Sequence, residues 1–272
     1  MARIDYRRQD ITEVLAALPL ESADVLFCHS NLGFFGRLEN GAGADSLCTI
    51  FMEEILARIA PGGTLVVPTF TYSFPRGEVY DVERSRSHMG MFTEWIRTRP
   101  EAVRSLDPCY SVAAVGRRAA ELTNDLPTNS FTETSFFGRF LNCNGKILNF
   151  NFDAGSTFVH FAERRLKVPY RFDKSFTGIV REGGVERSAA STIWVRYLSD
   201  DALEAEFANF DEIARAEGLF VTKRLGRGEL GTISAQATLD LIARTLPRRP
   251  WFLTKAEKLG IRNPTIVPEA KA

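Results

Sequence analysis

Apolar positions fall along the chain in two patterns, short continuous runs and longer amphipathic stretches. The runs at residues 24–28 and 64–72 predict two buried strands, the first of which ends at residues 29–30. Between them, apolar residues recur every three or four positions from 47 to 59, as in a helix, and Pro61-Gly62-Gly63 ends this pattern. A strand, a helix and a strand at this spacing indicate a βαβ unit with a largely parallel sheet.

The rest of the chain continues this alternation. Residues 73–90 are polar and irregular, which predicts a surface loop, and two alternating segments about Gly183-Gly184 predict a small antiparallel hairpin near 178–198. We expect an α/β fold, a central largely parallel or mixed sheet flanked by helices, as a single domain of residues 1–272 with a loose tail at about 262–272. Further strands are expected at 109–116, 146–152 and 219–225, and helices at 91–100, 134–143, 157–166, 202–216 and 234–245.

Composition and charge exclude several classes of protein. Lys plus Arg equals Asp plus Glu, at 34 each, so no overall field favours nucleic acid or an acidic membrane surface. No apolar run approaches the roughly 18 residues of a membrane helix, and the first residues lack the apolar centre of a signal peptide. The four cysteines are widely spaced, so we expect reduced thiols and a cytoplasmic protein. The sequence does not decide between a monomer and a homo-oligomer.

His160 is the most informative candidate residue. It follows an apolar run, Asp153 and a turn of small residues, and it lies near the start of a predicted helix. Residues three or four apart share a helix face, so Glu163 lies beside His160 and Thr157 lies one turn earlier. An imidazole with a pKa of about 6.5 can accept a proton at neutral pH, and Asp153 or Glu163 could fix its tautomer. The alternative is a partly buried structural histidine, with Ser156 or Thr157 as the helix cap.

Polar residues also lie at the ends of other predicted strands. His29 and Ser30 end the first strand, where α/β sheets gather ligands, although they could equally cap the strand. Cys28 is a conceivable nucleophile beside His29, but it lies within an apolar run. The glycine-rich stretch 40–46 could cradle a phosphate or form a flexible approach to the next helix. The chain has no G-x-S-x-G, Walker A or G-x-G-x-x-G sequence, so no nucleophile elbow, P-loop or dinucleotide site is predicted.

Four motifs, taken in order, resemble the aminoglycoside 3-N-acetyltransferases and their sugar-modifying relatives. They are "LFCHSNLGFFG", "APGGTLVVPTFTY", "RSLDPCYSVAAVG" and "GKILNFNFDAGSTFVHFAE". The resemblance covers most of the chain and ends in "LGTISAQATLDLIARTL". It implies an α/β fold unlike that of the GNAT acetyltransferases, acetyl-CoA as the donor, an amine on a small molecule as the acceptor, and no metal.

The resemblance also implies roles for individual residues. His160 corresponds to the family's base on the acceptor amine, within a motif that includes Asp153, Thr157 and Glu163. The coenzyme groove corresponds to His29, Ser30, Asn31, Thr69, Thr71 and Ser130. For the acceptor we select Asp107 and Tyr72, and, from its position in "YLSDD" alone, Asp200.

Several departures from the family pattern bear on the acceptor. Asp107 replaces a histidine of the family's "RS-x-HP" motif, the spacing from Asp153 to His160 is one residue longer, and Ser130 is not followed by proline. Long acidic insertions that suit polycationic antibiotics are also missing. A single amino sugar, for instance a nucleotide-linked one destined for a surface polysaccharide, is therefore at least as good a candidate as an aminoglycoside.

The leading hypothesis is acyl-CoA-dependent N-acyl transfer by direct attack, with His160 as the general base and Thr157 or backbone N–H groups on the oxyanion. Two other classes stay open. One is a metal-dependent hydrolase that uses His29, Asp107, Asp153 and His160, although no H-x-H or H-E-x-x-H pattern supports it. The other is a sugar-binding relative without catalysis. The sequence names neither the acceptor nor the acyl chain.

Overall fold

A seven-stranded sheet forms the centre of the computed structural model, which describes residues 4–41 and 43–268. The strand order is β4-β5-β2-β1-β6-β10-β9. β1 pairs in parallel with β2 and β6, and the outer pairs are antiparallel. The α/β class with a mixed central sheet is therefore confirmed, with parallel pairing confined to the three central strands. The strands are β1 (Val25–Ser30), β2 (Thr64–Pro68), β4 (Val103–Arg104), β5 (Val112–Gly116), β6 (Lys146–Phe150), β9 (Val221–Leu225) and β10 (Gly228–Ser234).

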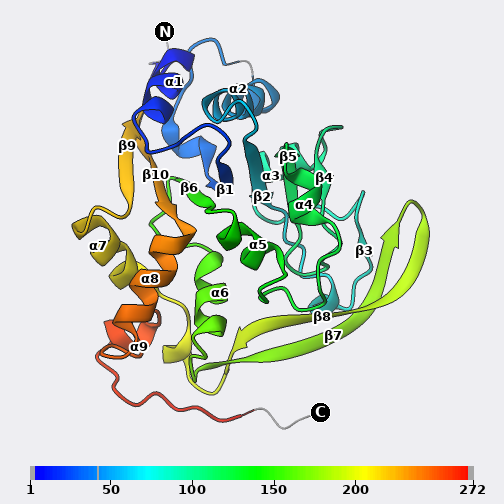
Figure 1. Cartoon of the computed structure of the whole chain (residues 1–272), viewed down its shortest axis with the longest axis vertical. Coiled ribbons are helices and arrows are strands. Elements are labelled where there is room, and N and C mark those ends of the chain that lie inside the picture. The colour runs from blue at the N-terminus through cyan, green and yellow to red at the C-terminus, as the bar shows by residue number, and fades with distance from the viewer. Residues whose placement is uncertain (1–3, 42, 269–272) are drawn as a thin grey trace.

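Helices cover both faces of this sheet (Figure 1). Successive side chains of a strand point to opposite faces, so β1 contributes Leu26 and Cys28 to one core and Val25 and Phe27 to another. The predicted β1–helix–β2 unit is present. The first core includes side chains of α1 (Arg8–Ala16), α2 (Gly43–Arg58) and α3 (Met91–Arg97); the second includes side chains of α4 (Ala119–Thr123), α5 (Phe136–Asn142), α6 (Phe158–Arg165), α7 (Ala208–Ala216) and α8 (Ala235–Thr245).

A long hairpin extends from this body (Figure 1). Its strands β7 (Arg171–Glu182) and β8 (Val185–Arg196) form a second sheet with β3 (Tyr80–Asp81). Gly183 and Gly184 both have positive φ, +56° and +81°, as a two-residue type I′ turn requires. The hairpin was predicted at 178–198, but pairing begins at Arg171. It is anchored to the body through Thr192, which exchanges backbone hydrogen bonds with Thr128 and Ser130.

Some elements were not predicted. The helix α1 buries only Ile11 and Leu15, so its apolar signal is weak. The strand β10 lies between β6 and β9, where it completes the sheet. Shorter pieces are the helix α9 (Lys255–Lys258) and the 3₁₀ turns η1 (Leu32–Phe35), η2 (Phe74–Arg76) and η3 (Asp201–Leu203).

The predicted loose tail lies partly outside the described residues. Up to residue 268 it is held to the preceding segment, because Thr265 N donates to Asp200 Oδ2 and Ser199 Oγ donates to Thr265 O. None of the helices in the described ranges is both long enough and apolar enough to span a bilayer.

Candidate active site

The carboxyl ends of β1 and β6 meet at the centre of the sheet, where their register places His29 opposite Asn149. Nδ1 of His29 lies 3.1 Å from Oδ1 of the buried Asn149, whose amide nitrogen donates to the carbonyls of Asp153 (2.6 Å) and Gly155 (3.1 Å). The amide oxygen therefore faces the ring, so Nδ1 carries the hydrogen. Burial lowers the pKa of His29 to about 4, which keeps the imidazole neutral. His29 thus holds, through Asn149, the turn that leads into α6.

This turn is tightly packed. Oδ1 of Asp153 accepts a hydrogen bond from the Gly155 backbone N–H at 2.8 Å, and Asp211 Oδ1 accepts one from Ala154 N. A Cβ at Gly155 would lie 2.5 Å from the ring of Phe207 and 2.9 Å from Asp153 Oδ1, so glycine is required by space here. Asp153 closes the turn, and a different carboxylate reaches the histidine of α6.

His160 and Glu163 form a pair in the first turns of α6. Nδ1 of His160 lies 2.6 Å from Oε2 of Glu163, which is fully buried. Two residues outside the helix hold the same carboxylate. Tyr170 donates its hydroxyl to Oε1 at 2.9 Å, and Nε of Arg171 forms an ion pair with Oε2 at 2.8 Å. The carboxylate is therefore fixed from three directions.

Charge sets the protonation state of this pair. Burial and the positive charge of Arg171 lower the pKa of His160, and together they outweigh the opposing effect of Glu163. Burial raises the pKa of Glu163, but Arg171 and His160 reverse this and hold it below its usual range. At neutral pH the pair is thus a neutral imidazole that donates Nδ1–H to a carboxylate. Nε2 has no hydrogen-bond partner among the described residues, and the side chain keeps 17% of its surface exposed. Its lone pair is free to accept a proton.

Aromatic rings surround the imidazole. The ring centres of Phe131 and Phe207 lie 6.4 and 5.9 Å from that of His160. Tyr110 packs edge-on against Phe131 at 4.8 Å, and Tyr72 packs against Tyr110 at 5.4 Å. This aromatic row connects Tyr72, predicted to face the acceptor, with the candidate base.

Asp107 lies on the wall of a cavity. Its Oδ1 accepts hydrogen bonds from the backbone of Cys109 and Tyr110, and its Oδ2 accepts one from Ser130 Oγ at 2.6 Å. Burial raises its pKa. No cation pairs with it in the part of the chain that the structure describes. Asp107 thus offers the cavity a desolvated carboxylate that is held only by neutral donors.

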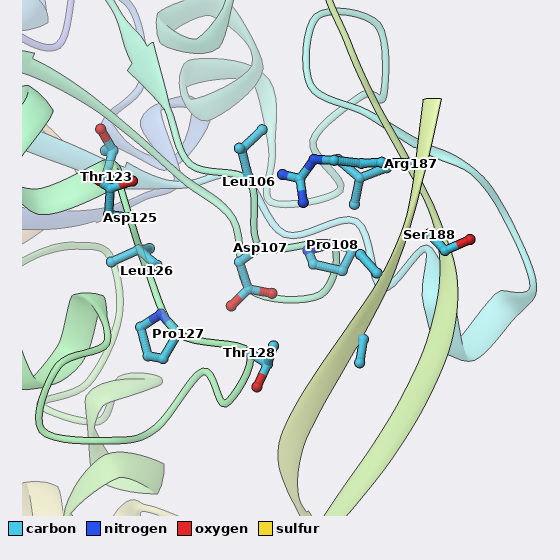
Figure 2. Close-up of a pocket in the computed structure, with 13 residues that line it drawn as sticks. Leu106, Asp107, Pro108, Thr123, Asp125, Leu126, Pro127, Thr128, Arg187 and Ser188 are labelled. Carbon is cyan, nitrogen blue, oxygen red and sulfur yellow. The ribbon is translucent and has the colours of Figure 1, made fainter. Parts of the chain in front are cut away.

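This cavity has a volume of about 410 Å³. Figure 2 shows it between the segment that carries Leu126, Pro127 and Thr128 and the hairpin that carries Arg187 and Ser188. Small-molecule sites typically measure about 300–1,000 Å³ and combine apolar walls with a few polar groups. The remaining lining residues are Leu106, Asp107, Pro108, Thr123, Asp125, Val180, Ala189 and Ala190.

The residues predicted to line the coenzyme groove are brought together only in part. Ser30 lies beside His29 at the end of β1, and its buried hydroxyl has no partner within the described residues. Asn31 follows and donates its backbone N–H to Phe150 O. Thr69 and Thr71 are almost fully buried, and their hydroxyls donate to Ser111 Oγ and Pro108 O, so they support the loop that carries Asp107. Ser130 contacts Asp107. Direct contact of these residues with a coenzyme stays a prediction.

The other predicted residues are placed as follows. Thr157 occupies the N-cap position of α6 without a side-chain cap bond. Asp200 lies elsewhere, where it caps the 3₁₀ turn η3 and holds Thr265. Cys28 is fully buried, and burial raises the pKa of its thiol, which opposes a role as nucleophile. Within residues 4–41 and 43–268, no three His, Cys, Asp or Glu side chains are grouped so that they could hold a metal ion.

Three residues of the site were missed from the sequence. Asn149 could have been found from the parallel register of two predicted strands that both end in polar residues. Tyr170 and Arg171 follow α6 by only a few residues, but they reach Glu163 because the chain turns back at the start of β7. No local pattern marks that reversal.

Comparison with known proteins agrees with the predicted resemblance. Aminoglycoside N(3)-acetyltransferase IV of Salmonella sp is 28% identical over 263 residues, which cover 95% of this chain and 94% of that protein. AAC-IIIb solved with CoASH shares the fold (TM-score 0.74, 22% identity, 89% and 97% of the two chains), in agreement with the prediction of acetyl-CoA as donor. So does a mutant of AAC(3)-IVa solved with a gentamicin (TM-score 0.76, 21% identity, 96% and 95%). The family model for aminoglycoside 3-N-acetyltransferase matches residues 27–247, which confirms the predicted enzyme class: the chain belongs to this family of N-acetyltransferases.

Proposed function

We propose that this protein transfers an acetyl group directly from acetyl-CoA to the amine of an amino sugar or aminoglycoside, with His160 as the general base. The observation that carries the proposal is the 2.6 Å contact between Nδ1 of His160 and Glu163, which leaves a neutral imidazole with an unpartnered Nε2. The family match, and the CoASH and gentamicin in the solved relatives, support the donor and the kind of acceptor.

In the proposed reaction, Nε2 of His160 takes a proton from the acceptor amine as its nitrogen attacks the thioester carbonyl. The new C–N bond forms, the C–S bond breaks, and the sulfur leaves as the thiol of CoA once it is protonated. Glu163 stabilises the imidazolium that forms, through Nδ1–H. The Thr157 hydroxyl makes no cap bond, so it is available to donate to the carbonyl oxygen as negative charge develops there.

Direct transfer is favoured over an acetyl-enzyme because no nucleophile is paired with the base. Among the described residues, no hydroxyl or thiol is hydrogen-bonded to His160. Burial raises the pKa of the thiols of Cys28 and Cys109, so neither is readily ionised.

The cavity beside Asp107 is the proposed place for the part of the acceptor that does not react. Its lining carries two carboxylates, Asp107 and Asp125, against one guanidinium, Arg187. A small net negative charge suits an acceptor with one or two ammonium groups better than a polycation, because Arg187 repels further positive charge. We therefore expect better turnover of a mono-amino sugar than of gentamicin-like antibiotics. On the coenzyme side we propose His29, Ser30 and Asn31 at the end of β1.

The test is acetylation by purified protein. Acetyl-CoA is incubated with a panel of amino sugars, amino-sugar nucleotides and aminoglycosides, release of CoA thiol is followed, and products are identified by mass spectrometry. We expect acetylated amine, and no acetylated protein after acetyl-CoA alone. A stable acetyl-enzyme would overturn direct transfer, and efficient turnover of polycations alone would overturn the acceptor proposal. No turnover and no binding of any acyl-CoA would overturn the whole proposal.

A further inference from the structure

Arg171 is a buried cation at the side of the candidate base that faces away from solvent. Its side chain is 6% exposed, and its Nε lies 2.8 Å from Oε2 of Glu163, the same oxygen that contacts Nδ1 of His160 at 2.6 Å. Nε makes no hydrogen bond of regular geometry, so its contact with Glu163 is electrostatic. Tyr170 differs from it, because its neutral hydroxyl donates a regular hydrogen bond to the other oxygen.

This arrangement changes how an acid–histidine pair behaves. A carboxylate alone stabilises the imidazolium and so favours a histidine that is already protonated. A cation on the same oxygen cancels much of that effect at close range, because the two nitrogens are only about 5 Å apart. The carboxylate can then orient the ring without protonating it.

We propose that Arg171 is a positioning residue for the acetyl-transfer reaction: its charge keeps Glu163 ionised and turned toward His160, and keeps the imidazole unprotonated until the acceptor amine gives up its proton. This inference rests on the proposed function, since it assumes that His160 is the base.

The surroundings of His160 support Arg171 as the source of the effect. Among the described residues, Glu163 and Arg171 are the charged groups that act on the imidazole. The other walls are aromatic, formed by Phe131 and Phe207. Tyr110 and Tyr170 lie nearby, and burial raises the pKa of each hydroxyl well above its usual range, so both are neutral. The carboxylate of Asp153 is engaged with Gly155 in the preceding turn, and Asp211 with Ala154.

Three variants of the full chain separate a charge effect from a structural one. Arg171→Met removes the charge, Arg171→Lys retains it, and Tyr170→Phe removes a neutral hydrogen bond from the same carboxylate. If Arg171→Met does not fold, Arg171→Gln replaces it. Two readouts are used: NMR titration of the His160 ring, assigned with His160→Gln, and single-turnover acetyl transfer from pH 5 to 9 with one acceptor.

In Arg171→Met we expect the His160 titration and the acid limb of the rate to move upward together by about one to two pH units. The rate at pH 7 should then fall by about tenfold and recover at high pH. Arg171→Lys should restore the limb, and Tyr170→Phe should leave it in place.

An unchanged His160 titration in a folded Arg171→Met or Arg171→Gln protein would overturn the inference, as would a loss of rate that is uniform across pH. The NMR titration needs no turnover. A shifted titration in a protein that transfers no acetyl group would therefore contradict the proposed function while supporting the electrostatic role of Arg171.

Discussion

Replacement of Glu163 by glutamine should destabilise the fold strongly, although the two side chains have nearly the same size. Glu163 is fully buried and holds three groups, the imidazole of His160, the hydroxyl of Tyr170 and the guanidinium of Arg171. Glutamine has one oxygen and no charge, so Arg171, itself 6% exposed, would be left as an uncompensated buried cation.

The magnitude follows from this loss of a partner. Removal of one member of a buried ion pair typically costs about 3–5 kcal/mol, whereas an exposed pair contributes about 0–1 kcal/mol. We therefore expect Glu163→Gln to lower the free energy of unfolding by about 3 kcal/mol or more. A matched control is Glu121→Gln, because Glu121 pairs with Arg118 on a helix surface at 54% exposure. The same substitution there should cost less than about 1 kcal/mol.

The assay is urea unfolding at pH 7.5, followed by tryptophan fluorescence, with the slope m compared between proteins. The pKa of Glu163 is lower in the fold than in the unfolded chain. Its stabilising effect is therefore complete above the unfolded pKa of about 4.3 and is lost as the pH falls through the folded pKa. The difference between wild type and Glu163→Gln should thus shrink in acid. A loss below about 1 kcal/mol at pH 7.5 would refute the view that this carboxylate is the structural centre of the site.

Three further predictions address other parts of the molecule. Burial lowers the pKa of His29 from 6.5 to about 4, so the unfolded chain binds its proton first as the pH falls; urea unfolding should show wild type losing about 3 kcal/mol more than His29→Asn between pH 7 and pH 4, and equal losses would contradict this. Arg104 donates to the carbonyls of Thr69, Val82 and Ser85, so Arg104→Met should cost about 3 kcal/mol, against a few tenths for the exposed Arg117→Met, and similar melting temperatures would argue against it. Acetyl-CoA at one hundred times its dissociation constant should stabilise the protein by about 2.7 kcal/mol, and calorimetry that shows no shift would exclude it as a ligand.

Much of the fold could be predicted from the hydrophobic pattern. Strands such as β1, β2 and β6 are buried on both faces, so they stand out as continuous apolar runs with polar residues at their ends. The glycine pair 183–184 has few alternatives to a tight turn, which made the hairpin predictable. The helix α1 and the strand β10 were missed because tertiary pairing, rather than local pattern, stabilises them.

The candidate site could be predicted less completely, for a physical reason. His160 and Glu163 are one helical turn apart, so their pairing follows from helix geometry alone. Asp153, the other candidate for that contact, instead closes its own turn on Gly155. The contacts of Arg171 with Glu163 and of Asp107 with Ser130 join separate elements. Such contacts depend on how elements pack, which no single-sequence pattern specifies.

The most direct test of the central claim is the single-turnover rate of His160→Gln at pH 7.5 with saturating acetyl-CoA and an accepted amine. Glutamine can still donate to Glu163 but cannot take up a proton, so the account predicts a loss of about 10²–10⁴-fold with an unchanged dissociation constant for acetyl-CoA. His88→Gln is the matched control, since His88 is exposed, lies beside Arg76 and should leave the rate unchanged. A folded His160→Gln protein with a near-normal rate would contradict the account.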